Sequence, residues 1–333
     1  MKRSDLDRRL PLRRFALLPL VLLLLILPGI GLSSYSMHLL IMLGINILLA
    51  MGFALLYSTG LITIGAAAFW AVGAYSSALL VLELNLSFWL AMPLAVLISA
   101  GLALLIGAVI VRAPGVAFVV QTMVINMIVV QILGQIEFFG GWGGLIGLPR
   151  PNPLGPITFA TKTEFYYLLL FLLLLTAGVF KALYASRVGR AWQSIQLNPR
   201  LALTLGINLY RYRLLAFVAA SASAGLAGSF YAHYFGTIEP GTFSVFKSIY
   251  IQIYAILGGL GFYLSGPVVG ALVMTFLPEF LRLSKEIEPI LTGGLLIGLV
   301  VFLPGGFLSL PHRIQIWLSN RNTDPVEQGE AGP

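Results

Sequence analysis

Side chains that could transfer protons or hold a metal are few in this chain and lie far apart. The three aspartates all fall near the chain ends, at Asp5, Asp7 and Asp324, and the chain has no cysteine. None of the three histidines has a second histidine or an aspartate at the spacing of metal ligands. The phosphate-binding pattern G-x-x-x-x-G-K-[ST] does not occur either. We therefore expect a protein that is not an enzyme, that needs no metal or cofactor, and that relies on a partner for any ATP hydrolysis.

Uncharged amides are the polar side chains that fall within the long apolar runs. Gln131 and Gln135 are four residues apart, so they share one face of a helix. Amides of this kind can line a path for a zwitterion or another small polar solute, and they can equally hold neighbouring helices together. The candidates for a translocation path are Asn46, Gln121, Asn126, Gln131 and Gln252.

The composition requires these side chains to be held in a membrane. Of the 333 residues 59% are hydrophobic and 10% are charged, and the mean hydropathy is +0.95. Soluble domains carry roughly 25% charged residues, so the excess apolar surface must face lipid. We predict an all-α integral membrane protein of about ten transmembrane helices, some of them broken or re-entrant. The expected spans are 15–32, 37–57, 62–82, 88–111, 116–136, 165–185, 212–234, 245–257, 266–283 and 289–308.

The basic residues indicate the orientation of these spans. With the N-terminus in the cytoplasm, most of the 20 Lys and Arg residues fall on the inner side, as the positive-inside rule requires. The net charge of +8 then reflects this bias rather than a nucleic-acid partner. Both termini are expected to be cytoplasmic, with a basic tail at 1–14, a transmembrane domain at 15–310 and a disordered tail at 311–333. The basic residues assigned to the outer side are Arg150, Lys162, Lys247, Arg282 and Lys285.

One inner segment, 186–211, is too long for a tight connection and contains four arginines, with a fifth at Arg213 just beyond it. Asn198 and Pro199 suit the start of a short helix, with Asn as the N-cap, and Gly206 suits its end. A helix–turn–helix element of this kind could be the contact for another subunit. The alternative is an amphipathic hairpin held on anionic lipid head groups by its arginines.

Glycine clusters interrupt the apolar runs at 59–75 and 257–271, in the same order in each half of the chain. Such a pair of interrupted segments points to an internal repeat and a transport pathway. Close packing of helices through small residues is the alternative, and it explains most of these glycines.

Five motifs together resemble the LivM-type permease of branched-chain amino-acid ABC importers. They occur in that family's order, and the resemblance covers most of residues 35–310. The motifs are GAAAFWAVGAY (65–75), GGLIGLPRP (143–151), GRAWQSIQLNPRLALTLGI (189–207), AFVAASASAGLAGSFYA (216–232) and GGLGFYLSGPVVGA (258–271).

The resemblance implies a multi-pass subunit of the bacterial inner membrane that works with several partners. These are a second related permease, two cytoplasmic ATPase subunits, a periplasmic solute-binding protein and the lipid bilayer. It also implies that short cytoplasmic helices transmit the movement of the ATPases to the spans. The matching residues are Gly189, Arg190, Arg200, Ala202 and Gly206. Many relatives have E-x-A-A near Arg200, whereas this chain has Pro199-Arg200-Leu201-Ala202, so no acidic contact to the ATPase is carried over.

The expected function is that of a transmembrane permease subunit that moves branched-chain amino acids, or a similar small polar solute such as another amino acid, urea or an amide, into the cell. A stand-alone channel or secondary transporter is the alternative. A membrane-embedded enzyme is disfavoured because the spans lack aspartate, cysteine and paired histidines.

Overall fold

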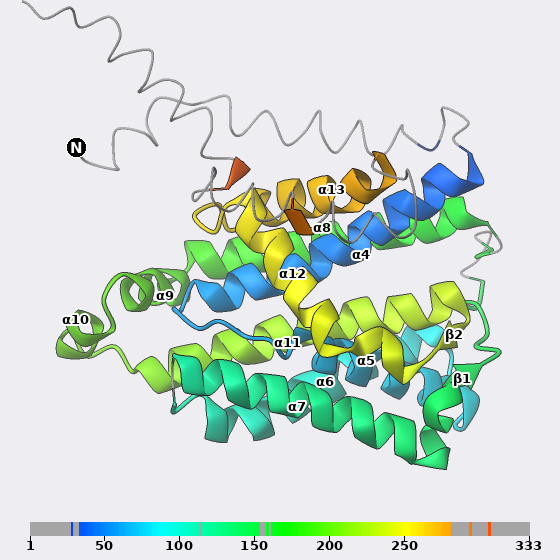
Figure 1. Ribbon diagram of the computed structural model, residues 1–333, viewed down its shortest axis with the longest axis horizontal. Coiled ribbons are helices and arrows are strands. Elements are labelled where there is room, and N and C mark those ends of the chain that lie inside the picture. The colour runs from blue at the N-terminus through cyan, green and yellow to red at the C-terminus, as the bar shows by residue number, and fades with distance from the viewer. Residues whose placement is uncertain are drawn as a thin grey trace, which may run out of the picture.

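A computed structural model describes residues 28, 33–113, 115–153, 158–159, 161–280, 293–294 and 306–307 of the chain. Within these ranges it is a bundle of helices that run along one long axis (Figure 1). Five helices are long and apolar enough to cross a membrane, and three shorter apolar helices accompany them. The long helices are α4 (Ser34–Tyr57), α6 (Phe88–Ile110), α7 (Val116–Gln135), α8 (Lys162–Ala185) and α11 (Leu209–Phe235). The shorter ones are α5 (Ala66–Leu82), α12 (Val245–Gly258) and α13 (Ser265–Phe280).

The all-α prediction is confirmed, and eight of the ten expected spans correspond to these eight helices. The expected spans 15–32 and 289–308 fall almost entirely outside the described residues, as do the tails 1–14 and 311–333. Besides the helices, the described part has one short antiparallel pair of strands. In this pair, β1 (Leu145–Ile146) lies beside β2 (Thr237–Ile238). It ties the loop after α7 to the chain that follows α11.

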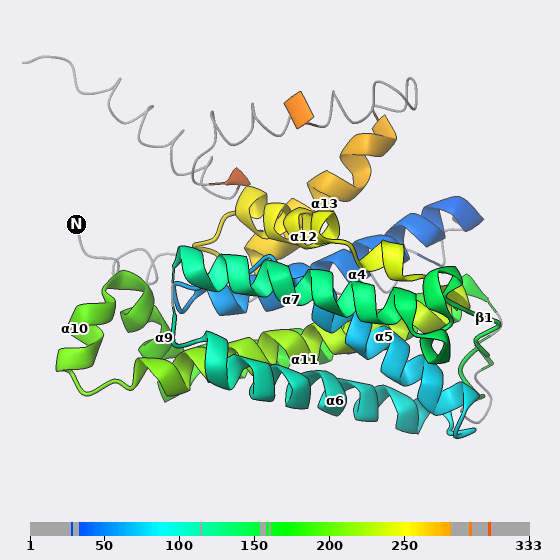
Figure 2. The ribbon, with the colours of Figure 1, turned by 60° about the horizontal axis from the view of Figure 1, so that its bottom comes forward.

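Helix α11 lies at the centre of the bundle and contacts α4, α5 and α6 (Figure 2). Small residues make this possible, because a Cβ added at Gly73 of α5 would lie 2.2 Å from the carbonyl oxygen of Gly225 in α11. One turn further on, a Cβ at Gly228 would lie 2.1 Å from the carbonyl oxygen of Trp70. The backbones of α5 and α11 thus touch directly, as in other close crossings of membrane helices. For Gly73, in the glycine cluster at 59–75, the close contact agrees with the packing explanation.

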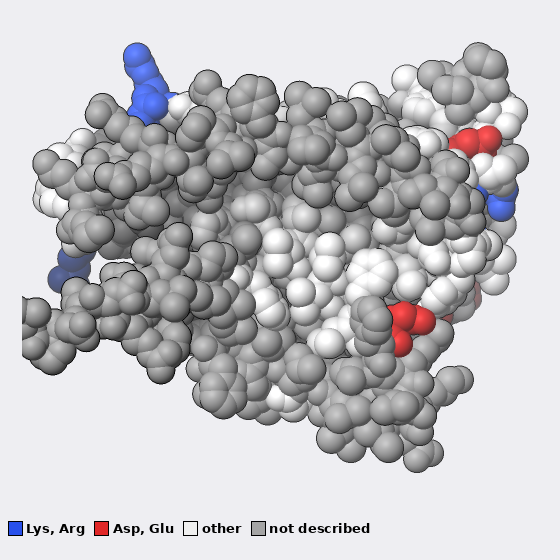
Figure 3. All heavy atoms as spheres, turned by 90° about the horizontal axis from the view of Figure 1, so that it is seen from above, with Lys and Arg blue, Asp and Glu red and all other residues white. Residues whose placement is uncertain are grey.

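Apart from Lys247, which is described below, the described charged residues lie toward the two ends of the long axis. On the face shown in Figure 3, Lys and Arg lie toward both ends, whereas Asp and Glu lie toward one end. The C-terminal ends of α6 and α8 meet the N-terminal end of α11 at one end, which we call the basic end. Its described charges are Arg112, Lys181, Arg187, Arg190, Arg200, Arg211 and Arg213. All the described acidic residues lie toward the other end, here the acidic end: Glu83, Glu137, Glu164, Glu239 and Glu279.

Two helices begin inside the bundle instead of at one of its ends. Helix α5 begins at Ala66, and the non-helical residues 61–65 lead to it from the end of α4. The backbone N–H of Ile64 donates to the Thr122 hydroxyl at 3.2 Å, which places the start of α5 well along α7. Helix α12 begins at Val245, after β2 and the short 3₁₀ helix η4 (Pro240–Phe243). The expected spans 62–82 and 245–257 are therefore interrupted segments, and the re-entrant character expected of 245–257 agrees with this.

Candidate functional site

Two short helices, α9 (Arg187–Leu197) and α10 (Pro199–Thr204), extend from the basic end of the bundle (Figure 1). We call residues 187–206 the coupling hairpin, after the role that the family resemblance predicts for this segment. The Asn198 side chain caps α10, because its Oδ1 accepts from the N–H groups of Arg200 at 3.0 Å and Leu201 at 3.1 Å. Helix α10 ends at Thr204, and Gly206, two residues later, terminates it with a φ of 77° in the left-handed region. The expected start at Asn198–Pro199 and the expected end at Gly206 are both confirmed.

The last turn of α10 is closed by two backbone bonds. The Gly206 N–H donates to the Leu203 carbonyl, and the Ile207 N–H donates to the Ala202 carbonyl, both at 3.0 Å. This 5→2 and 6→1 pattern is the Schellman motif, which satisfies carbonyl groups that the helix end leaves free. The hairpin therefore has a defined shape although α10 has only six residues.

The coupling hairpin is fixed to the bundle by Gly189 and Trp192. A Cβ at Gly189 would lie 2.2 Å from the Tyr184 carbonyl oxygen, so the start of α9 packs directly on the end of α8. The Trp192 side chain is fully buried, and its indole N–H donates to the Tyr212 carbonyl of α11 at 2.8 Å. Trp192 also packs edge-on against Tyr184, with ring centroids 6.0 Å apart. Helix α9 is therefore in direct contact with the end of α8 and the start of α11.

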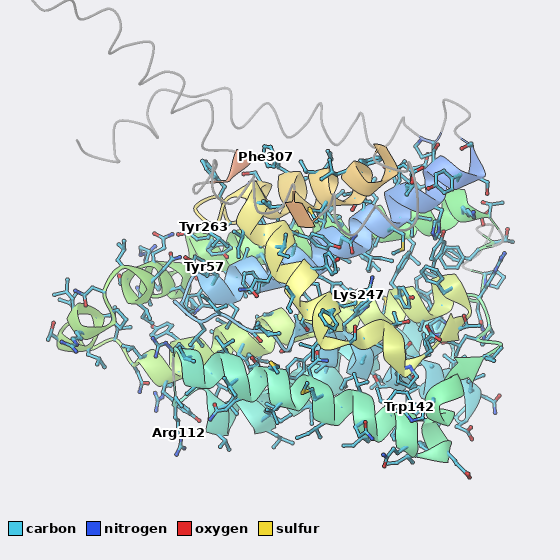
Figure 4. The ribbon with its side chains drawn as sticks, viewed as in Figure 1. Tyr57, Arg112, Trp142, Lys247, Tyr263 and Phe307 are labelled. Atoms are coloured by element: carbon cyan, nitrogen blue, oxygen red, sulfur yellow. The ribbon has the colours of Figure 1, made fainter. Side chains whose placement is uncertain are left out.

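Tyr184, which packs against Trp192, also contacts the loop between α12 and α13. The Tyr184 ring stacks on Tyr263 with centroids 4.5 Å apart and planes 24° apart. Figure 4 labels Tyr263 and Tyr57 near the basic end, where this loop approaches the end of α4. The hairpin is thus connected by packed aromatic rings to the segment that joins two of the shorter helices.

The outer side of the coupling hairpin is apolar and basic at once. Arg190 and Arg200 are exposed, as is Gly206, whereas Gly189 and Ala202 are buried against the rest of the hairpin and the bundle. Four leucines nevertheless project into solvent, with exposed fractions of 56% to 76%: Leu197, Leu201, Leu203 and Leu205. A short helix end with exposed leucines beside arginines is suited to docking in an apolar groove with an acidic rim.

A second polar cluster, the mid-depth network, joins the two interrupted segments to α7. The Asn126 amide donates to the Phe243 carbonyl at 3.0 Å, and its Oδ1 accepts from the Ser248 hydroxyl at 3.0 Å. The Ser248 oxygen also accepts from the backbone N–H of Ala67 at 2.9 Å. Asn126 and Ser248 are both fully buried. Asn126 therefore holds α5, α7 and α12 together and does not face an open path.

The other candidates for a path have different surroundings. The Asn46 amide donates to the Thr275 hydroxyl at 3.2 Å, which joins α4 to α13. Gln121 is partly buried, and its Oε1 finds no donor among the described residues. Gln131 is exposed on α7, and Gln252 is partly exposed on α12. The structure thus uses Asn46 and Asn126 to join helices and leaves Gln131 and Gln252 on the outer surfaces of α7 and α12, which contact each other.

Lys247 was assigned to the outer side from the sequence, and this assignment is wrong. Its neighbour Ser248 bonds to Asn126, which lies ten residues after the start of the 20-residue helix α7. At 1.5 Å per residue this is about 15 Å from either end of α7. Figure 4 shows Lys247 near the middle of the long axis. The sequence analysis missed it because a span of 245–257 places residue 247 at a helix end, whereas the chain reaches that depth before α12 begins.

A cavity of about 170 Å³ opens at the acidic end between α4, α8 and α11. Its lining combines the basic residues Arg150 and Lys162 with His38 and the aromatic rings of Phe165, Tyr234 and Phe235. The Lys162 ammonium donates to the Ser34 carbonyl at 3.0 Å, and His38 Nδ1 is 2.8 Å from the Tyr234 hydroxyl. These residues close the end of the bundle that carries the loop 136–153.

Apolar spanning helices, two segments interrupted at mid-depth and a polar hairpin anchored at one end together define a polytopic membrane transport protein. Residues 35–303 match the family described as the branched-chain amino acid transport system permease component. The chain belongs to this family and is a permease component, so the resemblance found in its motifs is confirmed.

Among its relatives are two high-affinity branched-chain amino acid transport system permease proteins named LivM. That of Salmonella typhimurium is 28% identical over 292 residues, which cover 80% of this chain and 67% of the relative. That of Escherichia coli K12 is 28% identical over 301 residues, covering 84% and 69%. The permease protein LivH of Escherichia coli K12 is 29% identical over 159 residues, covering 46% of this chain and 50% of LivH. No solved structure matches the chain significantly.

Proposed function

We propose that this chain is one of two related permease subunits of an ABC importer that moves branched-chain amino acids, or a similar small polar solute, into the cell. Two cytoplasmic ATPase subunits supply the energy, and a periplasmic solute-binding protein delivers the solute. The observation that carries the proposal is the coupling hairpin, a structured element with exposed leucines, anchored at the basic end of a transport-family bundle. The names and the permease family of its relatives support the choice of solute.

The orientation follows from the charge separation. With seven described basic residues and no described acidic residue, the basic end belongs in the cytoplasm under the positive-inside rule. The coupling hairpin then projects into the cytoplasm, where ATPase subunits reside. The cavity lined by Arg150 and Lys162 faces the periplasm. Both termini are cytoplasmic under this proposal, and the membrane is the bacterial inner membrane.

The hairpin can transmit ATPase movement because its buried side is fixed to the bundle. Its exposed leucines dock in an ATPase groove, and its buried side is fixed to α8 through Gly189 and to α11 through Trp192. A rotation of α9 is therefore passed to α11, which contacts α4, α5 and α6 in the centre of the bundle. Interfaces as closely packed as α5 against α11 switch between discrete arrangements and do not deform continuously. Alternating access between the two sides of the membrane follows from such a switch.

The test is reconstitution of the chain with and without its partners. The tagged chain is purified from its host in mild detergent, the co-purifying proteins are identified by mass spectrometry, and radiolabelled leucine uptake into proteoliposomes is measured. We expect ATPase subunits and a second permease to co-purify, and uptake to require ATP. Leucine flux through the chain alone without ATP would overturn the proposal in favour of the stand-alone channel or secondary transporter.

The role of the hairpin is tested separately by the double variant Leu201→Ser/Leu205→Ser. Both leucines are more than half exposed, so the fold should be unaffected while ATPase co-purification falls. Gln196→Ala, in the same hairpin but without an exposed apolar side chain, is the matched control and should retain the ATPase. Equal recovery of ATPase with both variants would exclude these leucines as the docking surface.

A further inference from the structure

Lys247 is a cation at the middle of the bundle, far from the ends where the other described charges gather (Figure 4). Its depth is fixed by its neighbour, because the Ser248 hydroxyl bonds to Asn126 at the midpoint of α7. Ser248 points inward and is fully buried, whereas the Lys247 side chain is exposed on the outside of this single chain.

Nothing in the fold explains a lysine at this place. An ammonium at the bilayer centre is costly, and such residues face a protein interior or a water-filled path and mark the route of a substrate. Lys247 also lies in the first turn of α12, where the helix dipole disfavours a cation. None of the acidic residues in the described ranges forms an ion pair with it, since all of them lie toward the acidic end.

The residues beside Lys247 on the outer face of α12 are large and apolar. Phe246 is 74% exposed, and Tyr250, one turn later, is 39% exposed. The adjoining helix α7 presents an exposed stripe that includes Met127 and Gln131. A single cation framed by aromatic and aliphatic side chains is suited to a ligand with one carboxylate and an apolar body.

We propose that Lys247 lines the translocation path at the middle of the membrane and binds the carboxylate of the transported solute. This inference rests on the proposed function, because the surface of α7 and α12 becomes the wall of a path only when the second permease subunit covers it. Binding by a point charge alone lets Lys247 accept any amino acid of suitable size, while Phe246 and Tyr250 contact the side chain of the solute.

The absence of cysteine from the chain allows a direct test with Lys247→Cys in the assembled transporter. We expect leucine uptake to fall about tenfold or more, the factor that corresponds to roughly 1.4 kcal/mol. Treatment with 2-aminoethyl methanethiosulfonate restores an ammonium at this position and should restore most of the uptake. The 2-sulfonatoethyl reagent, which is membrane-impermeant and adds a negative charge, should label the cysteine and leave uptake low.

Leu97→Cys is the matched control, because Leu97 lies near the middle of α6 and is 66% exposed on an apolar surface. A lipid-facing cysteine at that depth should resist the sulfonate reagent, and uptake should be unchanged. Equal resistance of Lys247→Cys to this reagent would place residue 247 against lipid and overturn the inference. Recovery of uptake with both reagents would show that the size of the side chain at residue 247, and not its positive charge, is required. This result also overturns the inference.

Lys247→Arg and Lys247→Met complete the test without chemical modification. We expect Lys247→Arg to retain uptake near the original level. We expect Lys247→Met to lose uptake about tenfold while the ATPase subunits are recovered equally. Full uptake with Met refutes the role of Lys247 while leaving the importer intact. If the unmodified transporter itself shows no ATP-dependent leucine uptake, the proposed function fails first, so the two failures are distinguishable.

Discussion

Replacing Gly189 by alanine adds one methyl group at the joint between the coupling hairpin and the bundle. This Cβ would lie 2.2 Å from the Tyr184 carbonyl oxygen and 2.4 Å from its Cα. Both are backbone atoms, so no rotamer change can make room. The end of α8 and the start of α9 must therefore separate by about an ångström, and the hairpin must tilt on the bundle.

The expected cost follows from two opposing effects. Overpacking of a closed contact costs roughly 1–3 kcal/mol, and exchanging glycine for alanine within a helix returns about 1 kcal/mol. Because the clash involves only backbone, we take the upper part of the range and expect Gly189→Ala to destabilise by about 2 kcal/mol. Gly178→Ala provides the contrast, because a Cβ at this exposed position in α8 would meet nothing within 4 Å. The same exchange there should stabilise by up to about 1 kcal/mol.

The assay measures the thermal midpoint of the purified complex and the leucine molecules imported per ATP hydrolysed. Gly189→Ala should lower the midpoint and reduce import per ATP severalfold while ATP hydrolysis continues. Gly178→Ala should leave import per ATP unchanged and keep or raise the midpoint. If Gly189→Ala imports as efficiently as the original protein at an unchanged midpoint, the rigid joint between α8 and α9 does not exist and the coupling argument fails.

Three further outcomes are expected. Gly206→Val should lower import, because a φ of 77° costs a β-branched residue about 1–2 kcal/mol. Gly206→Asn should import nearly normally, because asparagine tolerates this conformation. Equal import by both variants would contradict the assigned helix end. Gly73→Val should abolish recovery of folded protein, since even a Cβ would lie 2.2 Å from the Gly225 carbonyl oxygen. A normal yield of folded protein, measured by size-exclusion chromatography, would show that α5 and α11 do not touch. Asn126→Leu should destabilise the protein by roughly 1–3 kcal/mol, and so lower its thermal midpoint, because it leaves buried partners unpaired. Gln131→Leu, on the exposed face of α7, should not, and equal midpoints of the two variants would disprove the mid-depth network.

The helices of the described part were predictable from the sequence because lipid requires long apolar runs and few charges. The caps of α10 were predictable for a local reason, since Asn198, Pro199 and Gly206 act within their own turn. The family followed from several short motifs in one order. Each of these features is encoded within about twenty residues of the chain.

The mid-depth network could not be predicted in this way. Ser248 meets Ala67 and Asn126 across separations of 181 and 122 residues, and no local pattern specifies such a meeting. Trp192 was not among the residues predicted from the sequence, because its role depends on the bond from its indole N–H to the Tyr212 carbonyl of another helix. Lys247 was misplaced because its depth depends on these distant partners. The spacing of apolar residues in the sequence predicts which face of a helix a residue occupies. The position of that residue along the long axis of the bundle depends, in an interrupted segment, on tertiary contacts.

The long separation within the mid-depth network has a consequence for how the protein is made. Synthesis proceeds from the N-terminus, so Asn126 and the first turn of α5 leave the ribosome more than a hundred residues before Ser248 does. Until then, the Ala67 N–H and the Asn126 amide have no Ser248 or Phe243 to bond with, and hydrocarbon offers no substitute. We therefore expect these polar groups to stay hydrated, or to stay within the insertion machinery, until α12 has been synthesised. The contacts among α5, α7 and α12 then form late in the assembly of the bundle.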